Sequence, residues 1–271
     1  MWADAVARIS AGEVVVVDDA LGFTTAAGAL ADVKSLLHLG RLRGDNVSAA
    51  IGPVIYRAMP RLWDSYRLIA WMKTDDVEAE APYLAHAARG LDALVSALGI
   101  AERILGTPLN PAWPPLGISA DPHGSLLAVG GFNGTRYAKH SDAGARKQRK
   151  LTAIWYPLSE PRWVEGAGGE LVIQRPRGAP SRGGAHAADA QREMRVAPRT
   201  DRLVLFHSEL IHEVLPCAHP RISLTSWAHG VGSRTNAPQK HLDMGPECTS
   251  DMCRAASDGA APAEPRIIAT G

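Results

Sequence analysis

Hydrophobic positions in the first hundred residues recur at helical spacing. Leu30, Val33 and Leu37 stand at i, i+3 and i+7, which predicts one apolar helical face. A second stripe of apolar residues predicts a helix over residues 81–98. Before both, the β-branched run at residues 13–17 is typical of a short buried strand. We interpret these elements as packing elements without a chemical role.

From residue 125 onward the pattern changes to short β-type runs separated by Gly, Asn and Pro. The pair Asn133-Gly134 lies between the first two runs and is a strong signal for a hairpin turn. The runs cover residues 125–132, 136–142, 151–158, 170–174, 194–197, 203–207 and 221–229. Helices followed by many short strands predict an α+β, mainly β, protein built on a sandwich or barrel.

Two segments show neither the helical spacing nor the short β-type runs. Residues 175–189 are rich in Gly, Arg, Ala and Pro, which is typical of a mobile loop. Periodicity ends near Gly230, and we expect an irregular or disordered tail over residues 231–271. This division predicts one domain over residues 1–230, with a helical part over 1–115 and a β-rich part over 116–230.

Composition and charge exclude several classes of protein. Lys and Arg total 29 and Asp and Glu total 28, so a general nucleic-acid binder or a polybasic membrane-surface protein is not expected. No apolar stretch reaches the ~18 residues of a membrane span, and the N-terminal residues lack the pattern of a secretory signal. The three cysteines argue against a disulfide scaffold. We therefore expect a cytoplasmic or nuclear protein.

The first candidate for chemistry is the tripeptide His140-Ser141-Asp142. On an extended segment the side chains of His140 and Asp142 point to the same side and can bind one metal ion. Taken alone, such a pair is more often a surface turn or a satisfied polar pair. Farther along the chain, His212 supplies a second imidazole. Two imidazoles and one carboxylate make the facial triad of non-haem Fe(II) oxygenases.

The second candidate is Arg221, which opens an alternating strand. Arg221, Ser223, Thr225 and Trp227 fall on one face of that strand. A buried arginine needs an anionic partner, and its guanidinium matches a carboxylate with two hydrogen bonds. An arginine shortly after a metal-binding histidine therefore indicates a dicarboxylate co-substrate that chelates the metal at its other end. A salt bridge to a core carboxylate is the alternative.

Together these residues resemble the catalytic core of the iron- and 2-oxoglutarate-dependent prolyl hydroxylases. The resemblance is greatest to the cytosolic or nuclear type that hydroxylates hypoxia-inducible factor. It rests on Asn133-Gly134-Thr135, Tyr137-Ala138-Lys139-His140-Ser141-Asp142, Leu151-Thr152-Ala153-Ile154-Trp155-Tyr156, Gly168-Gly169-Glu170-Leu171, Asp201-Arg202-Leu203-Val204-Leu205-Phe206, His212-Glu213-Val214, Arg221 and Trp227. With weaker matches upstream it covers most of residues 13–230. It implies a double-stranded β-helix (jelly-roll) core with N-terminal helices packed on one sheet.

The resemblance also implies roles for individual residues. His140, Asp142 and His212 would bind Fe(II), and Arg221 would pair with the distal carboxylate of 2-oxoglutarate. Tyr156 would donate a hydrogen bond to that carboxylate, and Thr225 would assist. Ile154 and Leu171 would line the co-substrate pocket, and Trp227 would form a wall of the metal site. The implied reaction converts 2-oxoglutarate and O2 to succinate and CO2 while a prolyl residue is hydroxylated, with ascorbate as the expected reductant.

The chain departs from the family at positions that contact co-substrate and substrate. Gly130 stands where the family has a tyrosine in the co-substrate pocket. Ser65 and Arg67 stand where the animal enzymes have an Arg-x-Asp pair that engages the substrate. His207 rivals His212 as a metal ligand, but we interpret His207 as structural because the family aligns His212. Substrate recognition is therefore less constrained by the sequence than the chemistry is.

Three functions remain open. The first is hydroxylation of a proline-containing protein or peptide, in oxygen sensing or on a ubiquitin-ligase adaptor. The second is a 2-oxoglutarate dioxygenase that hydroxylates another residue or a small molecule. The third is a non-catalytic binding module on the same fold, against which the intact triad argues. We expect a monomer without a nucleic-acid or membrane partner.

Overall fold

The structure is a computed structural model of the chain, and it describes residues 2–44, 68–72, 79–105, 125–130, 135–143, 149–174, 193–217 and 219–230. The expected loop at 175–189, the expected tail at 231–271 and the departures at Ser65 and Arg67 lie outside these residues. The division into one domain and a tail accordingly stays a prediction. No helix in the described ranges combines the length and the apolar character that a membrane crossing requires.

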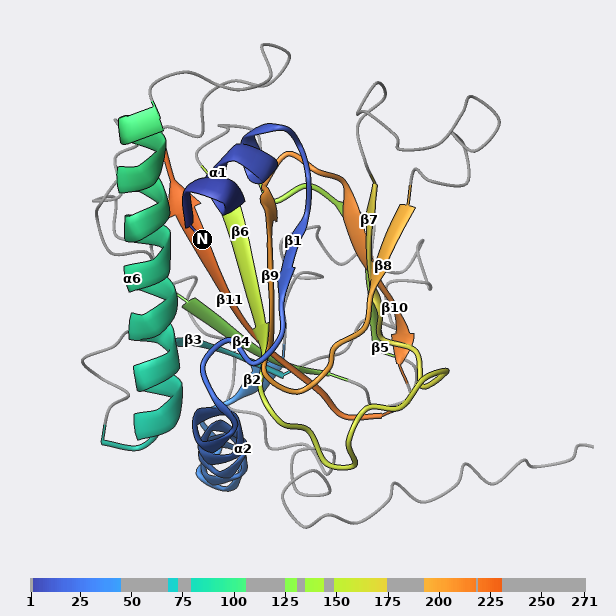
Figure 1. Cartoon of the computed structure of the whole chain (residues 1–271). Coiled ribbons are helices and arrows are strands. Elements are labelled where there is room, and N and C mark those ends of the chain that lie inside the picture. The colour runs from blue at the N-terminus through green and yellow to red at the C-terminus, as the bar shows by residue number, and fades with distance from the viewer. Residues whose placement is uncertain are drawn as a thin grey trace, which may run out of the picture.

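Two antiparallel sheets form the centre of the molecule (Figure 1). The major sheet has the order β1 (Val15–Val17), β9 (Arg202–His207), β6 (Arg149–Tyr156), β11 (Arg221–His229), β4 (Ser125–Gly130), β3 (Leu68–Met72) and β2 (Arg43–Gly44). The minor sheet has the order β5 (Thr135–His140), β10 (His212–Cys217), β7 (Leu171–Gln174) and β8 (Glu193–Val196). Most neighbouring strands are not consecutive in sequence, such as β1 and β9, β11 and β4, and β5 and β10, as jelly-roll connections require. The predicted mainly β fold is confirmed.

Three helices pack on the outer face of the major sheet. They are α1 (Trp2–Ser10), α2 (Phe23–His38) and α6 (Pro82–Leu105), and α6 lies along one side of the sheet in Figure 1, away from the minor sheet. Leu84, Leu91 and Leu98 of α6 are fully buried in a core that also contains Ile222 and Leu224 of β11. Alternation along a strand therefore places Arg221, Ser223, Thr225 and Trp227 on the opposite, inner face.

A second, smaller core lies between the two sheets. The major sheet contributes buried side chains such as Ile154, Tyr156 and Phe206, and the minor sheet contributes Leu171 and Ile173. This core occupies the interior of the jelly roll. The site-bearing face of β11 lies beside it, because Thr225 is the direct register partner of Ile154.

Several elements differ from the sequence prediction. The helix expected over 81–98 runs over Pro82–Leu105 and continues through Gly99, since one glycine inside a helix costs only about 1 kcal/mol. Strands β2, β3 and β10 and helix α1 were not predicted. Strand β10 contains Glu213 and Pro216, which interrupt the apolar alternation. Its pairing with β5 and β7 makes it a strand.

Asp201 connects the helical part of the chain to the major sheet. It is almost fully buried and adopts a positive φ of 57°. Its carboxylate accepts hydrogen bonds from the backbone N–H of Leu21 (2.9 Å) and Gly22 (2.7 Å) and from Nε1 of Trp155 (2.8 Å). Its own backbone N–H donates to the carbonyl of Tyr156. One carboxylate therefore holds the start of α2 against the strand that carries Tyr156.

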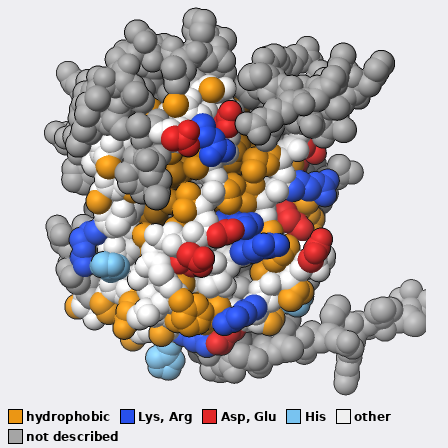
Figure 2. All heavy atoms as spheres, viewed as in Figure 1, with side chains coloured by type: hydrophobic (Ala, Val, Ile, Leu, Met, Phe, Trp, Pro, Cys, Tyr) orange, Lys and Arg blue, Asp and Glu red, His pale blue; other side chains and the backbone are white. Residues whose placement is uncertain are grey.

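Charged side chains are mixed over the molecular surface. Figure 2 shows basic and acidic side chains close together on the face it presents. Arg202 and Asp18 form an ion pair, in which Nε and Nη2 of the arginine donate to the two carboxylate oxygens at 2.6 and 2.8 Å. This interleaving fits the near-balance of charges in the sequence.

Candidate metal and co-substrate site

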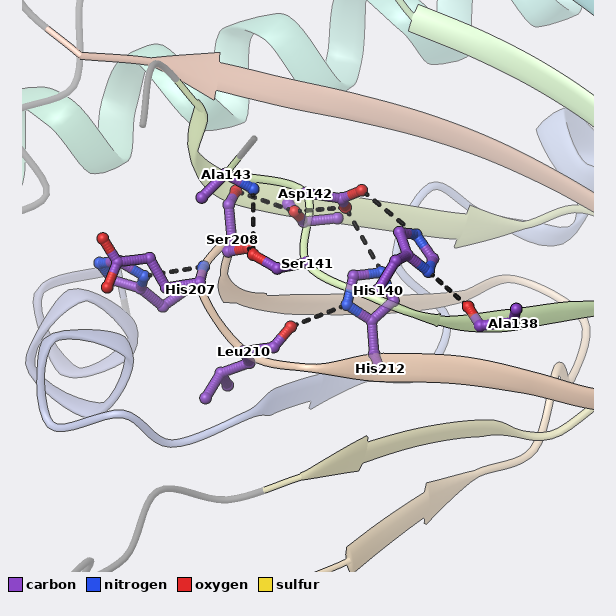
Figure 3. Close-up of polar contacts among 11 residues, drawn as sticks. Ala138, His140, Ser141, Asp142, Ala143, His207, Ser208, Leu210 and His212 are labelled. Atoms are coloured by element: carbon purple, nitrogen blue, oxygen red, sulfur yellow. Dashed lines mark hydrogen bonds and ion pairs between the residues drawn. The ribbon is translucent and has the colours of Figure 1, made fainter. Parts of the chain in front are cut away.

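Three predicted metal ligands converge at one end of the minor sheet. His140 ends β5 and His212 begins β10, and these two residues are direct register partners. Asp142 lies in the turn that follows β5. Nε2 of His140 is 3.5 Å from Oδ1 of Asp142, and Nε2 of His212 is 3.5 Å from Oδ2 (Figure 3). One ligand atom from each residue lies within 4.8 Å of the others.

Backbone carbonyls orient both imidazoles. Nδ1 of His140 donates a hydrogen bond to the carbonyl of Ala138 at 2.8 Å, and Nδ1 of His212 donates to the carbonyl of Leu210 at 2.9 Å. A proton fixed on Nδ1 leaves the lone pair of Nε2 free. In Figure 3 both Nε2 atoms face Asp142. The two rings are thus held in the tautomer that binds a metal through Nε2.

Hydroxyl groups from neighbouring strands hold the carboxylate of Asp142. Oγ1 of Thr152 donates to Oδ2 of Asp142 at 2.9 Å and also lies 2.9 Å from Oγ of Ser208. The turn itself is bonded to Ser208, whose carbonyl accepts hydrogen bonds from Oγ of Ser141 and the backbone N–H of Ala143. Asp142 therefore has a fixed position before any ligand binds.

The protonation states match those of metal ligands. Burial alone would raise the pKa of the Asp142 carboxyl, but His140 and His212 beside it hold that pKa well below its usual value. Burial lowers the pKa of His212, despite the nearby Asp142. An ionised carboxylate and neutral imidazoles are the forms that bind metals. Two nitrogen donors and one oxygen donor on one side suit Fe(II) and leave its other positions open.

His207 lies apart from this cluster. It is fully buried at the end of β9, and its Nδ1 accepts a hydrogen bond from the backbone N–H of Glu209 at 3.2 Å. Figure 3 shows its ring directed away from Asp142. Burial, opposed by Glu209, lowers the pKa of His207 to about 4. This placement supports the interpretation of His207 as structural.

Arg221 points into the interior of the jelly roll. Its Nε donates to the carbonyl of Gly169 at 3.0 Å, and its Nη2 donates to the hydroxyl of Tyr156 at 3.0 Å. Tyr156 is fully buried, and burial raises the pKa of its phenol although Arg221 opposes that rise. The hydroxyl therefore stays protonated. These contacts hold the guanidinium at the head of β11, as a carboxylate anchor requires.

The space in front of Arg221 is a small hollow that is partly open to solvent. Its lining residues are Ala128, Gly130, Thr135, Arg136, Tyr137, Val214 and Arg221. The ring of Tyr137 also packs edge-on against that of His140, with 4.1 Å between centroids. Tyr137 thus connects the hollow at Arg221 with the cluster of metal ligands.

The other predicted pocket residues lie on the same inner surface. Ile154 and Leu171 belong to the core between the sheets, and Thr225 is partly exposed beside Ile154. The indole of Trp227 is only 6% exposed and lies on the same face of β11 as Arg221. The roles assigned to these residues and to the metal ligands stay predictions.

Three residues near the site were missed from the sequence. The guanidinium of Arg149 lies 3.9 Å from the ring centroid of Trp227, and the ring of Trp71 lies 5.8 Å from that of Trp227. Tyr137 packs against His140. Tyr137 lies inside a quoted motif and could have been selected. Arg149 and Trp71 come together only through the pairing of β3, β4, β11 and β6.

Comparisons with known proteins agree with this geometry. Residues 126–229 match the model of the 2OG-Fe(II) oxygenase superfamily. The chain is 30% identical over 128 residues to a hypoxia-inducible factor prolyl hydroxylase of Caenorhabditis elegans, an alignment that covers 46% of this chain and 16% of that relative. This chain therefore matches only a small part of that relative's length.

Two solved structures show the same fold. A prolyl-4-hydroxylase of Pseudomonas putida superimposes with a TM-score of 0.60 at 21% identity, over 86% of this chain and 100% of the other. A prolyl hydroxylase of Trichoplax adhaerens, solved with a peptide of the hypoxia-inducible factor oxygen degradation domain, superimposes with a TM-score of 0.60 at 18% identity, over 84% and 90% of the two chains. At these identities the likeness establishes the fold.

Proposed function

We propose that this chain, whose residues 126–229 match the model of the 2OG-Fe(II) oxygenase superfamily, is a member of that superfamily: an Fe(II)- and 2-oxoglutarate-dependent dioxygenase that hydroxylates prolyl residues of a protein. The observation that carries the proposal is the convergence of His140, Asp142 and His212 beside a hollow that contains Arg221. Tyr137 lies between these two parts and contacts both.

Each of the predicted site residues would have its own part in this activity. Bound Fe(II) would supply the activation of O2 that couples decarboxylation of 2-oxoglutarate to hydroxylation. Nε2 of His140, Nε2 of His212 and the Asp142 carboxylate would hold the metal. Arg221 would bind the distal carboxylate of 2-oxoglutarate and so fix the direction of that molecule. Tyr156, bonded to Arg221, would keep the guanidinium in place.

A prolyl substrate is supported by the relatives and by the residues around the metal ligands. The Caenorhabditis elegans relative is named a hypoxia-inducible factor prolyl hydroxylase, and the Trichoplax adhaerens structure contains a peptide of the hypoxia-inducible factor oxygen degradation domain. In this chain the indole ring of Trp71 lies 5.8 Å from that of Trp227, with the two ring planes tilted by 44°. The exposed indole of Trp71 would give a pyrrolidine ring an apolar surface to pack against. The departures at Ser65 and Arg67 favour, as an alternative, a different residue or a small molecule as substrate.

Further parts of the proposal come from the family resemblance and from composition. Ascorbate would keep the iron reduced, and the protein would act as a monomer in the cytosol or nucleus without a nucleic-acid partner. Modification of a protein in oxygen sensing is the cellular role that fits these features. Light scattering on the purified chain and cell fractionation test the state of assembly and the location.

The activity is tested by succinate formation from 2-oxoglutarate with Fe(II) and O2. We expect metal-dependent turnover in the wild type and none in His212→Ala, with His38→Ala as a control because His38 is exposed and far along the chain from the site. No turnover in the wild type, or equal turnover in His212→Ala, would contradict the proposal.

The substrate is tested by mass spectrometry of proteins that co-purify with the chain. We expect the mass of one oxygen atom added at proline, only when Fe(II) and 2-oxoglutarate are present. Turnover of 2-oxoglutarate with no modified proline would leave the dioxygenase chemistry in place and favour the alternative substrate.

A further inference from the structure

Two buried hydroxyl groups form a chain of hydrogen bonds that ends on the carboxylate of Asp142. Oγ1 of Thr152 donates to Oδ2 of Asp142 at 2.9 Å, and the same Oγ1 lies 2.9 Å from Oγ of Ser208 (Figure 3). Thr152 and Ser208 are both fully buried. Thr152 lies on β6 and Ser208 directly follows β9, so the chain joins two paired strands of the major sheet to the turn after β5.

The direction of these hydrogen bonds follows from the number of protons. An ionised carboxylate, the form that binds a metal, only accepts hydrogen bonds, and a hydroxyl group has one proton to donate. Because Thr152 gives its proton to Asp142, Ser208 is the donor and Thr152 the acceptor in the bond between the two hydroxyls. Donation from Ser208 polarises the Thr152 hydroxyl and so strengthens the bond to the carboxylate.

The two oxygens of Asp142 have different surroundings as a result. Oδ2 lies 3.5 Å from Nε2 of His212 and also accepts the hydrogen bond from Thr152. Oδ1 lies 3.5 Å from Nε2 of His140, whose proton is on Nδ1. A hydrogen bond to one oxygen of a ligating carboxylate fixes the direction in which the other points. With Oδ2 held by Thr152, Oδ1 is the oxygen that we expect to bind the metal.

The short segment after β9 holds other parts of the ligand set as well. The carbonyl of Ser208 accepts hydrogen bonds from Oγ of Ser141 and from the backbone N–H of Ala143, each at 3.0 Å, which fixes the turn that carries the carboxylate. Two residues farther on, the carbonyl of Leu210 accepts the hydrogen bond from Nδ1 of His212. Residues 208–210 therefore contact the supports of both the carboxylate and one imidazole.

We propose that Thr152 and Ser208 are positioning residues of the metal site. Ser208 donates to Thr152, and Thr152 holds the carboxylate of Asp142 in the orientation that binds the metal through Oδ1. The inference rests on the proposed function, because the carboxylate is held in place for Fe(II). Neither hydroxyl is a predicted ligand, and the Ser208 hydroxyl acts only through Thr152.

The experiment is calorimetric titration of Mn(II) into the metal-free full chain, which needs no co-substrate and no turnover. Thr152→Val keeps the size of the side chain and removes the hydroxyl, and we expect the dissociation constant of Mn(II) to rise by about 10- to 100-fold. Thr152→Ser keeps the hydroxyl and should stay within about threefold of the wild type. Ser208→Ala should raise the constant by about three- to tenfold, through loss of one hydrogen bond.

A double variant distinguishes a chain of hydrogen bonds from two separate effects on the fold. If Ser208 acts through Thr152, its hydroxyl contributes nothing once that of Thr152 is gone. Thr152→Val combined with Ser208→Ala should then bind Mn(II) as weakly as Thr152→Val alone, whereas independent effects would multiply.

Ser226→Ala is the matched control. It also removes a fully buried hydroxyl that donates to an aspartate, but that aspartate is Asp92 on the outer side of the major sheet. The dissociation constant of Mn(II) should therefore stay at the wild-type value. Thermal unfolding of each variant checks that it is folded.

Three outcomes would overturn the inference by itself. They are an unchanged dissociation constant in Thr152→Val, a Thr152→Ser variant as weak as Thr152→Val, and a double variant in which the two effects multiply. In each case the wild type still binds Mn(II) and the proposed function stands. If Thr152→Val does not fold, an unchanged constant in Ser208→Ala overturns the inference instead. If the wild type binds no Mn(II), the proposed function fails and this inference fails with it.

Discussion

The two faces of β11 divide the work of the protein between stability and chemistry. On the outer face, Ile222, Leu224 and Ala228 are buried against the core that α6 covers. On the inner face, Arg221 lines the hollow and the Trp227 indole is buried. Because strand alternation separates the two sets, a substitution on one face should change stability and a substitution on the other should change binding. The predictions below compare the two faces.

The largest effect is expected at the metal ligands on the inner side. His212→Ala removes one of three donors, and loss of supporting residues alone typically costs 10- to 100-fold in metal affinity or activity. We expect turnover to fall by at least about a thousandfold while the thermal midpoint of the metal-free protein changes little, since no core methyl groups are lost. Activity and unfolding assays on one preparation check this. If His212→Ala failed to fold, a substitution on the inner side would change stability as well as chemistry, and the comparison of the two faces would fail.

The next effect is expected on the outer face. Leu224 is fully buried beneath α6, and Leu224→Ala should lower the free energy of unfolding by about 3 kcal/mol through lost burial and the cavity left behind. Turnover per folded molecule should remain close to that of the wild type at low temperature. Chemical denaturation and succinate formation measure the two quantities. A loss of turnover as large as that of His212→Ala would show that the faces are coupled.

A smaller effect is expected at Arg221. Arg221→Leu removes the anchor for the distal carboxylate, and one or two charged hydrogen bonds correspond to about 10- to 100-fold in the dissociation constant of 2-oxoglutarate. Metal affinity should stay within about threefold, because Arg221 is no ligand. Titration of Mn(II) and then of 2-oxoglutarate separates the two steps. If Arg221→Leu weakened the binding of Mn(II) and of 2-oxoglutarate equally, the metal ligands and Arg221 would not have separate roles.

The smallest expected effect is a change of folding stability with pH. It comes from a carboxyl group that contacts the outer face of β11. Burial raises the pKa of Asp92 on α6 to about 6, although a hydrogen bond with Ser226 of β11 opposes the rise. The folded state thus holds this proton more tightly than the unfolded state, so stability is lost as pH rises from about 4 to about 6. Asp92→Asn should remove this loss, of order 1 kcal/mol. Denaturation of both proteins at several pH values gives the difference, and an identical pH dependence would contradict the assignment.

The sequence predicted the parts of this arrangement that local periodicity encodes. His140 and Asp142 were found together because i and i+2 share a side, and Arg221 was found because it begins an alternating strand. Strand β10 was missed because Glu213 and Pro216 break the alternation, so only its partners identify it as a strand.

The hollow beside Arg221 could not be predicted from local sequence patterns. Gly130 and Arg221 are far apart in sequence and become neighbours only through the register of β4 and β11. Arg136 reaches the same space from the other sheet. Position 130 could be recognised as unusual from the sequence, whereas its nearness to Arg136 could not.

The central claim is that one metal and one dicarboxylate bind together inside the jelly roll. It is tested most directly by a crystal structure of the full chain, from crystals grown anaerobically with Fe(II) and 2-oxoglutarate. We predict a metal bound to Nε2 of His140, Nε2 of His212 and the carboxylate of Asp142, with the distal carboxylate of 2-oxoglutarate at Arg221. A metal ligated elsewhere, or a carboxylate bound away from Arg221, would contradict the account.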